Sequence, residues 1–493
     1  MRCKISYTSH LTSHFSLQCL IGVSMKKLKE LCTLENLLCL YIIICPILDI
    51  ASFLFRNYFN TNFSPSTIIR PLIPIICFTI LFFKENNKIK KIIIIGIYFL
   101  YSLIHFYFFQ KLHNGSSYGN IKNELQYIIN YSLMIVNLYL FYAIIKDKSK
   151  LKKAVYISLI IYVISIYFSI LTNTSSHTYL EGIGYKGYFE SGNSLCTVLV
   201  LGLCIIFSDF NFKQWGKISL IIFTGIYLIV FSEMRTGLFG FGIIVAIWII
   251  GKFFIAIKEK VYFNKKQLLI ITFGIILFVV LTFILGARTL ERRKMLKENE
   301  LNNFDEETQS IRYVTGDILN IYKKIQKNEI TNEFMSEAEQ KAIIDLCEFA
   351  EKHKISNVDL RKQQFIYNLF LVKEQKNPLL IIFGNGYKNQ TGELVMEMEI
   401  PALICNFGLI GFVLYFGPIL YLISSSLFRE LKRIKEIKID KIMYFTGCGL
   451  AILLSGISGY VFFNISSMTM AIVLCVLINS EKCNELENIR PVK

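Results

Sequence analysis

Apolar runs long enough to cross a lipid bilayer recur along this chain from residue 33 to residue 479. A transmembrane helix needs about 20 consecutive, mostly apolar residues. The composition agrees with such helices, because 54% of the 493 residues are hydrophobic and only 18% are charged, whereas about a quarter of the residues of a soluble domain are charged. A soluble globular enzyme and a disordered chain are therefore excluded. We predict an all-α polytopic membrane protein.

The apolar runs predict twelve transmembrane helices and one large polar loop. The twelve spans lie near residues 33–55, 68–83, 91–109, 124–145, 154–172, 193–208, 215–232, 236–256, 267–286, 400–428, 442–458 and 460–479. The predicted organisation begins with a cytoplasmic N-terminal segment (1–32) and nine helices (33–286). An extracytoplasmic loop (287–399), three further helices (400–479) and a cytoplasmic tail (480–493) follow. Residues 1–24 do not resemble a signal peptide, and we interpret them as an extension before a natural start at Met25.

The basic residues favour one orientation of these helices. The formal net charge of +17 is not gathered in one patch, as a nucleic-acid surface requires, but lies in short clusters in every second loop. Cytoplasmic loops of membrane proteins collect Lys and Arg. The clusters therefore predict that both termini lie inside and residues 287–399 outside, with no nucleic-acid partner. Nearly all of the thirteen cysteines lie in or beside apolar stretches, which favours packing thiols over disulfides.

The loop at residues 287–399 has the polar composition of a domain, and its sequence predicts helices. Apolar residues recur at helical spacing from Ile311 to Ile325. Two capping-box patterns follow, which are Ser336 with Glu339 and Ser356 with Asp359. We expect these helices to be too few and too short for a core of their own. They should instead lie against the external mouth of the bundle as a lid.

Two short polar turns between predicted helices carry groups suited to a substrate. The segment GYKGYFESGN ends at Asn193 and leads into the sixth span, where Asn193 can donate and accept hydrogen bonds. A flexible turn is the simpler interpretation of that segment. The turn from Glu233 to Gly237 contains Arg235. Its charges either anchor the chain at the membrane surface or place a guanidinium for diphosphate binding, and the sequence favours neither.

A third candidate is Arg361, in the first turn of the last helix of the loop. It shares one helical face with Gln364, Phe365 and Asn368. A guanidinium, two amides and an aromatic ring suit a sugar or a phosphate, although a solvated helix face is the commoner outcome for a single arginine.

A fourth candidate runs from the end of the loop into the tenth span. Gly384 and Gly386 permit a tight backbone turn. Glu397 and Glu399 follow at the outer threshold of the span. Two carboxylates at that place either supply a general base or favour the start of a helix through its dipole.

Taken in their order along the chain, these four signals resemble the O-antigen ligase and O-antigen polymerase family of bacterial membrane glycosyltransferases. The resemblance rests on the glycine-and-Asn lead-in, the arginine turn, the arginine-led helix and the run GxGY…ExE…GLIGFxLYFG. It covers nearly the whole chain, and it is greatest for polysaccharide polymerases of bacteria with a single membrane. The family implies a metal-independent transfer of a polyprenyl-diphosphate-linked oligosaccharide to a hydroxyl of an acceptor glycan.

The resemblance also implies roles for individual residues. Arg235 and Arg361 match arginines that hold the diphosphate, and Glu397 matches the first acid of an ExD-like pattern. Glu399 stands where the family has Asp, and its extra methylene moves the carboxylate by about an ångström. The ligases use a loop histidine, whereas His353 lies outside any motif of this loop. This favours a polymerase over a ligase.

General chemistry agrees with this assignment. A departing diphosphate develops negative charge, and arginines can stabilise it where no DxD cluster holds a metal. The predicted catalytic residues are Glu397, Glu399 and Arg361, and the predicted substrate-binding residues are Arg235, Asn193, Asn368, Gly384 and Gly386. We expect no metal and no cofactor. Asp49, in the first span, is a further candidate or an internal helix partner.

The expected partners are the lipid-linked oligosaccharide, the acceptor glycan, membrane lipid and proteins of polysaccharide assembly, at the plasma membrane of a bacterium. Three alternatives stay open, which are a ligase for finished glycans, a flippase for lipid-linked glycans and a non-catalytic assembly partner. Transporters commonly contain repeated halves, and this chain has no internal repeat.

Overall fold

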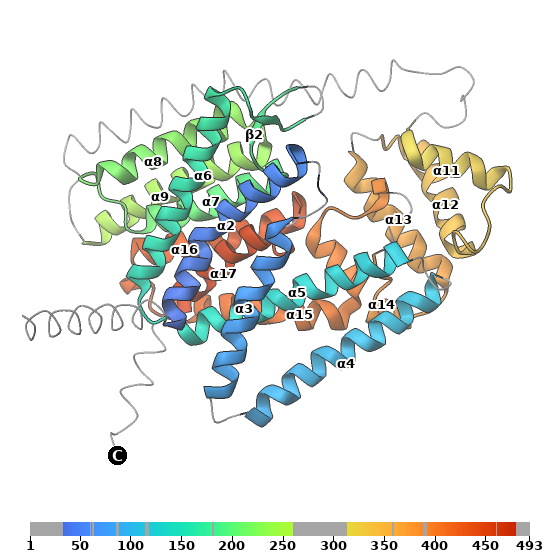
Figure 1. Cartoon of the computed structure of the whole chain (residues 1–493), viewed down its shortest axis with the longest axis horizontal. Helices are drawn as coiled ribbons and strands as arrows, with labels where there is room; N and C mark the ends of the chain where they lie inside the picture. Colours follow the sequence, from blue (N-terminus) through green and yellow to red (C-terminus); the bar gives the residue numbers. More distant parts are fainter. Residues whose placement is uncertain are drawn as a thin grey trace, which may run out of the picture.

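A computed structural model describes residues 33–59, 61, 64–84, 88–113, 118–179, 182–259, 313–356, 359–387, 392–459 and 461–479. These residues form mainly α-helices, and the all-α membrane fold is confirmed (Figure 1). The predicted N-terminal segment, the ninth span at 267–286 and the C-terminal tail lie outside the described residues. Each of the other predicted spans coincides with a helix.

The helices of the bundle are amphipathic or apolar along their whole length. They are α2 (Leu34–Asn57), α3 (Pro65–Lys84), α4 (Lys88–Leu112), α5 (Tyr118–Ile144), α6 (Lys148–Leu171), α7 (Gly192–Ser208), α8 (Trp215–Ile226) with the π-helical η1 (Tyr227–Phe231), α9 (Arg235–Glu259), α15 (Glu399–Lys432), α16 (Ile439–Ile457) and α17 (Ile465–Asn479). Eight of them are long and apolar enough to cross a membrane, whereas α7, α8 with η1, and α17 are shorter. The apolar helix α7 is buried on nearly every side, because α6, α9, α16 and α17 surround it.

Contacts between loops define two opposite ends of the bundle. At one end, which we call the basic end, Glu35 accepts hydrogen bonds from the backbone N–H groups of Lys146 and Asp147, at 2.9 and 2.8 Å. Lys217 bonds to Asp209 at this end, with 2.7 Å between Nζ and Oδ1. The α15–α16 turn, with the short 3₁₀ helix η5 (Ile434–Glu436), also lies there. The opposite end contains the first residues of α5, α7, α9, α15 and α17.

At this opposite end, three helices of the polar segment form a compact unit that we call the lobe. They are α11 (Gly316–Gln326), α12 (Glu337–His353) and α13 (Leu360–Gln375). The lobe has a hydrophobic cluster of its own, which includes the buried side chains of Ile318, Ile343 and Leu346. The expectation that these helices lack a core is therefore wrong, because their apolar faces pack on one another. We call the adjoining end of the bundle the lobe end.

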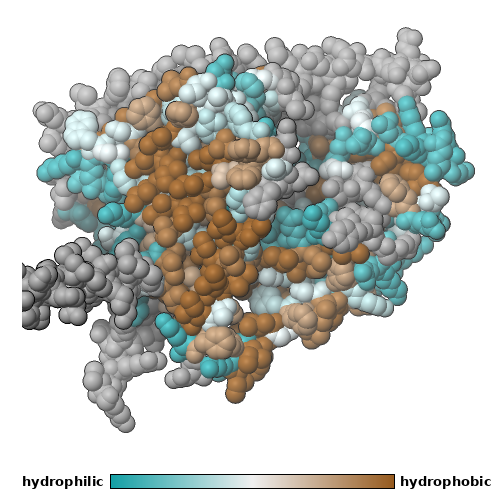
Figure 2. Space-filling model, viewed as in Figure 1, coloured by the Kyte–Doolittle hydropathy of each residue, from teal (hydrophilic) through white to brown (hydrophobic). Residues whose placement is uncertain are grey.

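The surface reflects this division into lobe and bundle. Figure 2 shows hydrophobic side chains over the visible faces of α2, α3 and α4 and hydrophilic side chains over the lobe. The predicted capping box at the start of α12 is present, since Ser336 and Glu339 bond reciprocally. At the second predicted box, the described helix α13 begins after Asp359 and not after Ser356, and the Asp359 backbone N–H bonds to the carbonyl of Ser356.

Short elements complete the lobe end. Strands β1 (Ser176–His177) and β2 (Tyr185–Gly187) form an antiparallel pair between α6 and α7. Helix α14 (Leu379–Phe383) and the 3₁₀ helix η4 (Gly392–Leu394) connect α13 to α15.

Candidate functional site

Arg361 and Glu397 meet where the lobe joins the bundle. The Arg361 Nε donates to Glu397 Oε2 over 3.0 Å. Its Nη1 and Nη2 donate to the carbonyl oxygens of Ile457 and Ser458, at 3.2 and 2.9 Å. A guanidinium at these last carbonyls also suits the negative end of the α16 dipole. The Arg361 and Glu397 side chains are 37% and 46% exposed, so the pair is open to a ligand.

Gln364 and Asn368 position the backbone beside this pair. The Gln364 side-chain oxygen accepts from the Glu397 N–H over 3.0 Å, and its amide donates to the Glu393 carbonyl over 2.8 Å. Asn368 in turn donates to the Gln364 carbonyl over 2.8 Å. Both amides are buried, whereas Phe365 is exposed. The sequence predicted that Arg361, Gln364, Phe365 and Asn368 share one helical face. Of their polar groups, only the Arg361 guanidinium lies next to solvent.

Glu399 takes a different role from its neighbour Glu397. Its side chain is fully buried, and its carboxylate accepts the backbone N–H groups of Val461 and Phe462, each over 2.8 Å, as well as that of Phe463. The carboxylate therefore fixes the turn between α16 and α17. A group enclosed in this way cannot reach an acceptor hydroxyl, and we assign Glu399 a positioning role in place of the predicted catalytic one.

Gly384 and Gly386 lie in a turn that packs against a break in helix α15, and their substrate-binding role stays a prediction. Helix α15 breaks at Gly408, where φ is 69° and ψ is 179°. The N–H groups of Asn385 and Gly386 bond to the freed carbonyls of Cys405 and Asn406, at 3.0 and 2.8 Å. A Cβ on Gly384 would lie 2.1 Å from the Asn406 oxygen. The turn thus supplies hydrogen bonds that a broken span requires inside a membrane.

Two buried histidine–glutamate pairs hold this turn, and neither was identified from the sequence. The ring nitrogens of His105 lie 2.7 Å from the Phe383 carbonyl and 2.5 Å from Glu124 Oε1. Those of His113 lie 2.9 Å from Glu339 Oε1 and from the Asn385 carbonyl. Ionisable residues within apolar helices were the signal for the first pair.

Arg235 is presented on a rigid turn at the start of α9. Ser232 follows η1, and its N–H bonds to the Tyr227 carbonyl over 2.9 Å. The next residue, Glu233, has a positive φ of 51°. Thr236 then donates to Asn193 Oδ1 over 3.1 Å, which joins the start of α9 to the start of α7. Arg235 is exposed and forms no ion pair within the described part of the chain. Asn193 therefore has a structural contact, and Arg235 has a free guanidinium.

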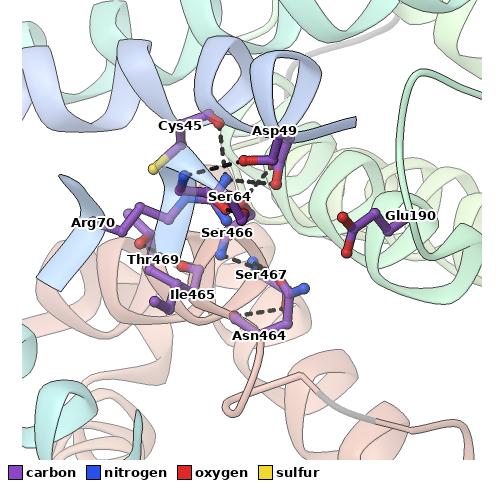
Figure 3. Close-up of polar contacts among 12 residues, drawn as sticks. Cys45, Asp49, Ser64, Arg70, Glu190, Asn464, Ile465, Ser466, Ser467 and Thr469 are labelled. Atoms are coloured by element: carbon purple, nitrogen blue, oxygen red, sulfur yellow. Dashed lines mark hydrogen bonds and ion pairs between the residues drawn. The ribbon is translucent and has the colours of Figure 1, made fainter. Parts of the chain in front are cut away.

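A second arginine–carboxylate pair lies between α2 and α3 (Figure 3). Asp49 Oδ1 is 2.7 Å from the Arg70 guanidinium. Asp49 Oδ2 accepts from Ser466 and Tyr162, at 2.9 and 3.1 Å. The pair lines a cavity of about 780 Å³ at the lobe end. Arg70 lies buried within α3. An arginine in an apolar helix, with an aspartate in the preceding helix, was the signal.

Comparison with protein families identifies this architecture. The model of the O-antigen ligase like membrane proteins matches residues 32–482. The chain belongs to this family. The resemblance inferred from the sequence is thereby confirmed, and family membership gives this multi-pass membrane protein a role in glycan processing. A search of curated proteins finds no match.

Proposed function

We propose that this O-antigen ligase-like protein polymerises polyprenyl-diphosphate-linked oligosaccharide repeat units into a surface polysaccharide at the outer face of a bacterial plasma membrane. The observation that carries the proposal is the Arg361–Glu397 pair, with 3.0 Å between Nε and Oε2 and with both side chains partly exposed. A cation for the leaving diphosphate and a base for the acceptor stand side by side at the junction of lobe and bundle.

The transfer requires one bond to form and one to break. The acceptor hydroxyl oxygen attacks the anomeric carbon of the donor, and the bond from that carbon to the diphosphate oxygen breaks. The electron pair leaves with the diphosphate, while Glu397 accepts the hydroxyl proton. Arg361 moves from Glu397 to the diphosphate and stabilises its developing charge with the free guanidinium of Arg235. The exchange of partners leaves Glu397 free to act as the base.

The distribution of basic residues supports an external lobe. Lys and Arg gather in the loops at the basic end, while the lobe occupies the opposite end of the bundle. The positive-inside bias therefore favours an external lobe and cytoplasmic termini. In this orientation the reaction takes place outside the cell, where a lipid-linked repeat unit has its glycan.

Elongation by the purified protein tests the proposal. We expect the full chain in lipid vesicles to convert lipid-linked repeat units, isolated from the source bacterium, into longer lipid-linked chains on a gel. Arg361→Ala should lower the rate by about 100-fold or more, a size typical for loss of one transition-state donor. Lys362→Ala, one position along α13 and outside the pair, is the matched control.

Three outcomes separate the candidate functions. Normal elongation by the folded, inserted Arg361→Ala variant would remove Arg361 from the site. Transfer of a preformed chain to another acceptor, without elongation, would indicate a ligase. Movement of the lipid-linked unit across the vesicle membrane without any new glycosidic bond would indicate a flippase.

A further inference from the structure

The link between α13 and α15 contains an apolar segment that is too short to cross a membrane. Residues 378–387 have the sequence PLLIIFGNGY, which contains no charged residue; the nearest ones are Lys376 and Lys388. We call this segment the insert. It comprises α14 and the glycine turn that packs against the break in α15. Because a span needs about 20 apolar residues, the sequence prediction includes the insert in the extracytoplasmic loop.

The insert lies below the lobe end of two transmembrane helices. The carbonyl oxygen of Phe383 is 2.7 Å from a ring nitrogen of His105. The first charged residue beyond His105 on α4 is Lys111, six residues and about 9 Å further towards the lobe. The Gly386 N–H bonds over 2.8 Å to the carbonyl of Asn406, which lies seven residues and about 10 Å inside α15. Two helices thus place the insert at a similar depth, within their apolar length.

The polar backbone groups of the insert have partners, as a place in hydrocarbon requires. Four consecutive N–H groups each donate to an oxygen within 3.0 Å, and they belong to Gly384, Asn385, Gly386 and Tyr387. The carbonyl oxygens of Phe383 and Asn385 face the rings of His105 and His113. Non-helical backbone occurs at membrane depth only where protein encloses it or where it lines a water-filled cavity. The glycine turn meets the first of these conditions.

One side of α14 is apolar and uncovered. Leu379, Ile381 and Ile382 are 44%, 47% and 37% exposed, whereas Leu380 between them is buried. Water around these side chains would cost free energy in proportion to their apolar area. Contiguous exposed apolar surface marks a contact with lipid or with another protein.

The helix beside α14 also exposes apolar side chains. α14 contacts α4 near the lobe (Figure 1), and the Phe383 ring stacks on Phe108 with 5.2 Å between the ring centroids. On the same stretch of α4, Leu103 and Tyr107 are 53% and 61% exposed. Since α4 is long and apolar enough to cross a membrane, its exposed apolar side chains suit hydrocarbon. This continuity, together with the absence of charge in the insert, favours lipid over a partner protein.

We infer that the insert is a re-entrant segment, which enters the membrane from the lobe side and places Leu379, Ile381 and Ile382 against the acyl chains of the lipid. With the external lobe proposed above, these chains belong to the outer leaflet. The insert lies in the sequence between Arg361 and Glu397, so it anchors the lobe in the bilayer beside that pair. The inference goes beyond the proposed function and does not rest on it.

Quenching of tryptophan fluorescence in vesicles of the full-length protein tests the inference. The chain has two tryptophans, Trp215 and Trp248, and their replacement by Phe gives a dark background for Ile381→Trp. We expect phosphatidylcholine with brominated acyl chains to quench most of the Ile381→Trp emission, and aqueous iodide to leave it unchanged. If the background variant does not fold, Ile381→Trp is added to the native chain and the emission of the native chain is subtracted.

Two control positions calibrate the quenching. Leu103→Trp, on the exposed side of α4, should be quenched by brominated lipid, and Glu329→Trp, in the exposed turn between α11 and α12, by iodide alone. Quenching of Ile381→Trp by iodide to the extent seen for Glu329→Trp would place α14 in water and overturn the inference. Protection from both quenchers would show that a protein, such as a second copy of this chain, covers α14, and would also overturn it.

The same experiment separates this inference from the proposed function, because quenching does not require activity. If brominated lipid quenches Ile381→Trp while the wild-type protein never elongates a glycan, the re-entrant segment stands and the polymerase proposal fails. If elongation depends on Arg361 while iodide quenches Ile381→Trp, the polymerase proposal stands and the re-entrant segment fails.

Discussion

Two arginine–carboxylate pairs occupy the lobe end, and their surroundings give them different uses. Asp49 and Arg70 are 24% and 6% exposed and belong to adjacent transmembrane helices. Arg361 and Glu397 are 37% and 46% exposed and join the lobe to the start of α15. A buried charge that loses its partner remains uncompensated, whereas an exposed pair contributes about 0–1 kcal/mol. The buried pair is suited to hold geometry, and the exposed pair can exchange a partner for substrate.

The largest stability effect is expected from breaking the buried pair. Arg70→Ala leaves Asp49 without its cation in the bundle and should destabilise the fold by about 3–5 kcal/mol. The measurement is the melting temperature in detergent together with the folded fraction on size exclusion. Arg361→Ala is the matched control and should leave the melting temperature nearly unchanged. Equal losses in the two variants would contradict the contrast between the pairs.

The double variant Asp49→Leu with Arg70→Met extends that comparison. Replacing both charges by apolar groups removes the uncompensated charge, so most of the lost stability should return. If the double variant is as unstable as Arg70→Ala alone, the ion pair itself, together with its hydrogen bonds to Tyr162 and Ser466, is what stabilises α2 against α3 and α17.

The second prediction compares the neighbouring glutamates, which differ in burial rather than in chemistry. Glu397→Gln should lower elongation about 100-fold, within the range for loss of a general base, while the melting temperature stays near that of the wild type. Glu399→Gln should mainly destabilise, by about 1–3 kcal/mol, because an NH₂ group would face backbone donors at the α16–α17 turn. The reverse pattern would exchange the roles that we assign to the two carboxylates.

The contrast between the pairs also explains what could be predicted from sequence. Apolar runs and helix caps depend on residues that are neighbours in the sequence. The transmembrane spans and the Ser336 cap could therefore be predicted from the sequence. The Arg361–Glu397 pair was anticipated through separate signals, but its contact with the end of α16 was not. Glu399 and Asp49 both accept hydrogen bonds from residues between 461 and 466, far away in the chain from Asp49 and across a helix from Glu399. Only the packing of helices that are distant in the sequence shows that the carboxylates of Glu399 and Asp49 are enclosed and that the carboxylate of Glu397 is open to solvent.

The smallest effect is expected at Cys347, and it bears on the orientation of the lobe. Burial raises the pKa of this thiol to about 12, and its side chain has no exposed surface. At pH 8 only about one thiol in 10⁴ would be the reactive thiolate, so a membrane-impermeant maleimide should not label native Cys347. Unfolding should restore labelling, because it returns the thiol to an ordinary pKa and to solvent.

Exposed positions provide the orientation test that Cys347 cannot. Glu329→Cys lies in the turn between α11 and α12, and Lys438→Cys lies between α15 and α16 at the basic end; both sites are exposed. With an external lobe, the maleimide should label Glu329→Cys in intact cells and Lys438→Cys only after permeabilisation. The opposite pattern would put the Arg361–Glu397 pair on the cytoplasmic side. The proposed external polymerisation would then fail, although the contrast between a buried and an open ion pair would remain.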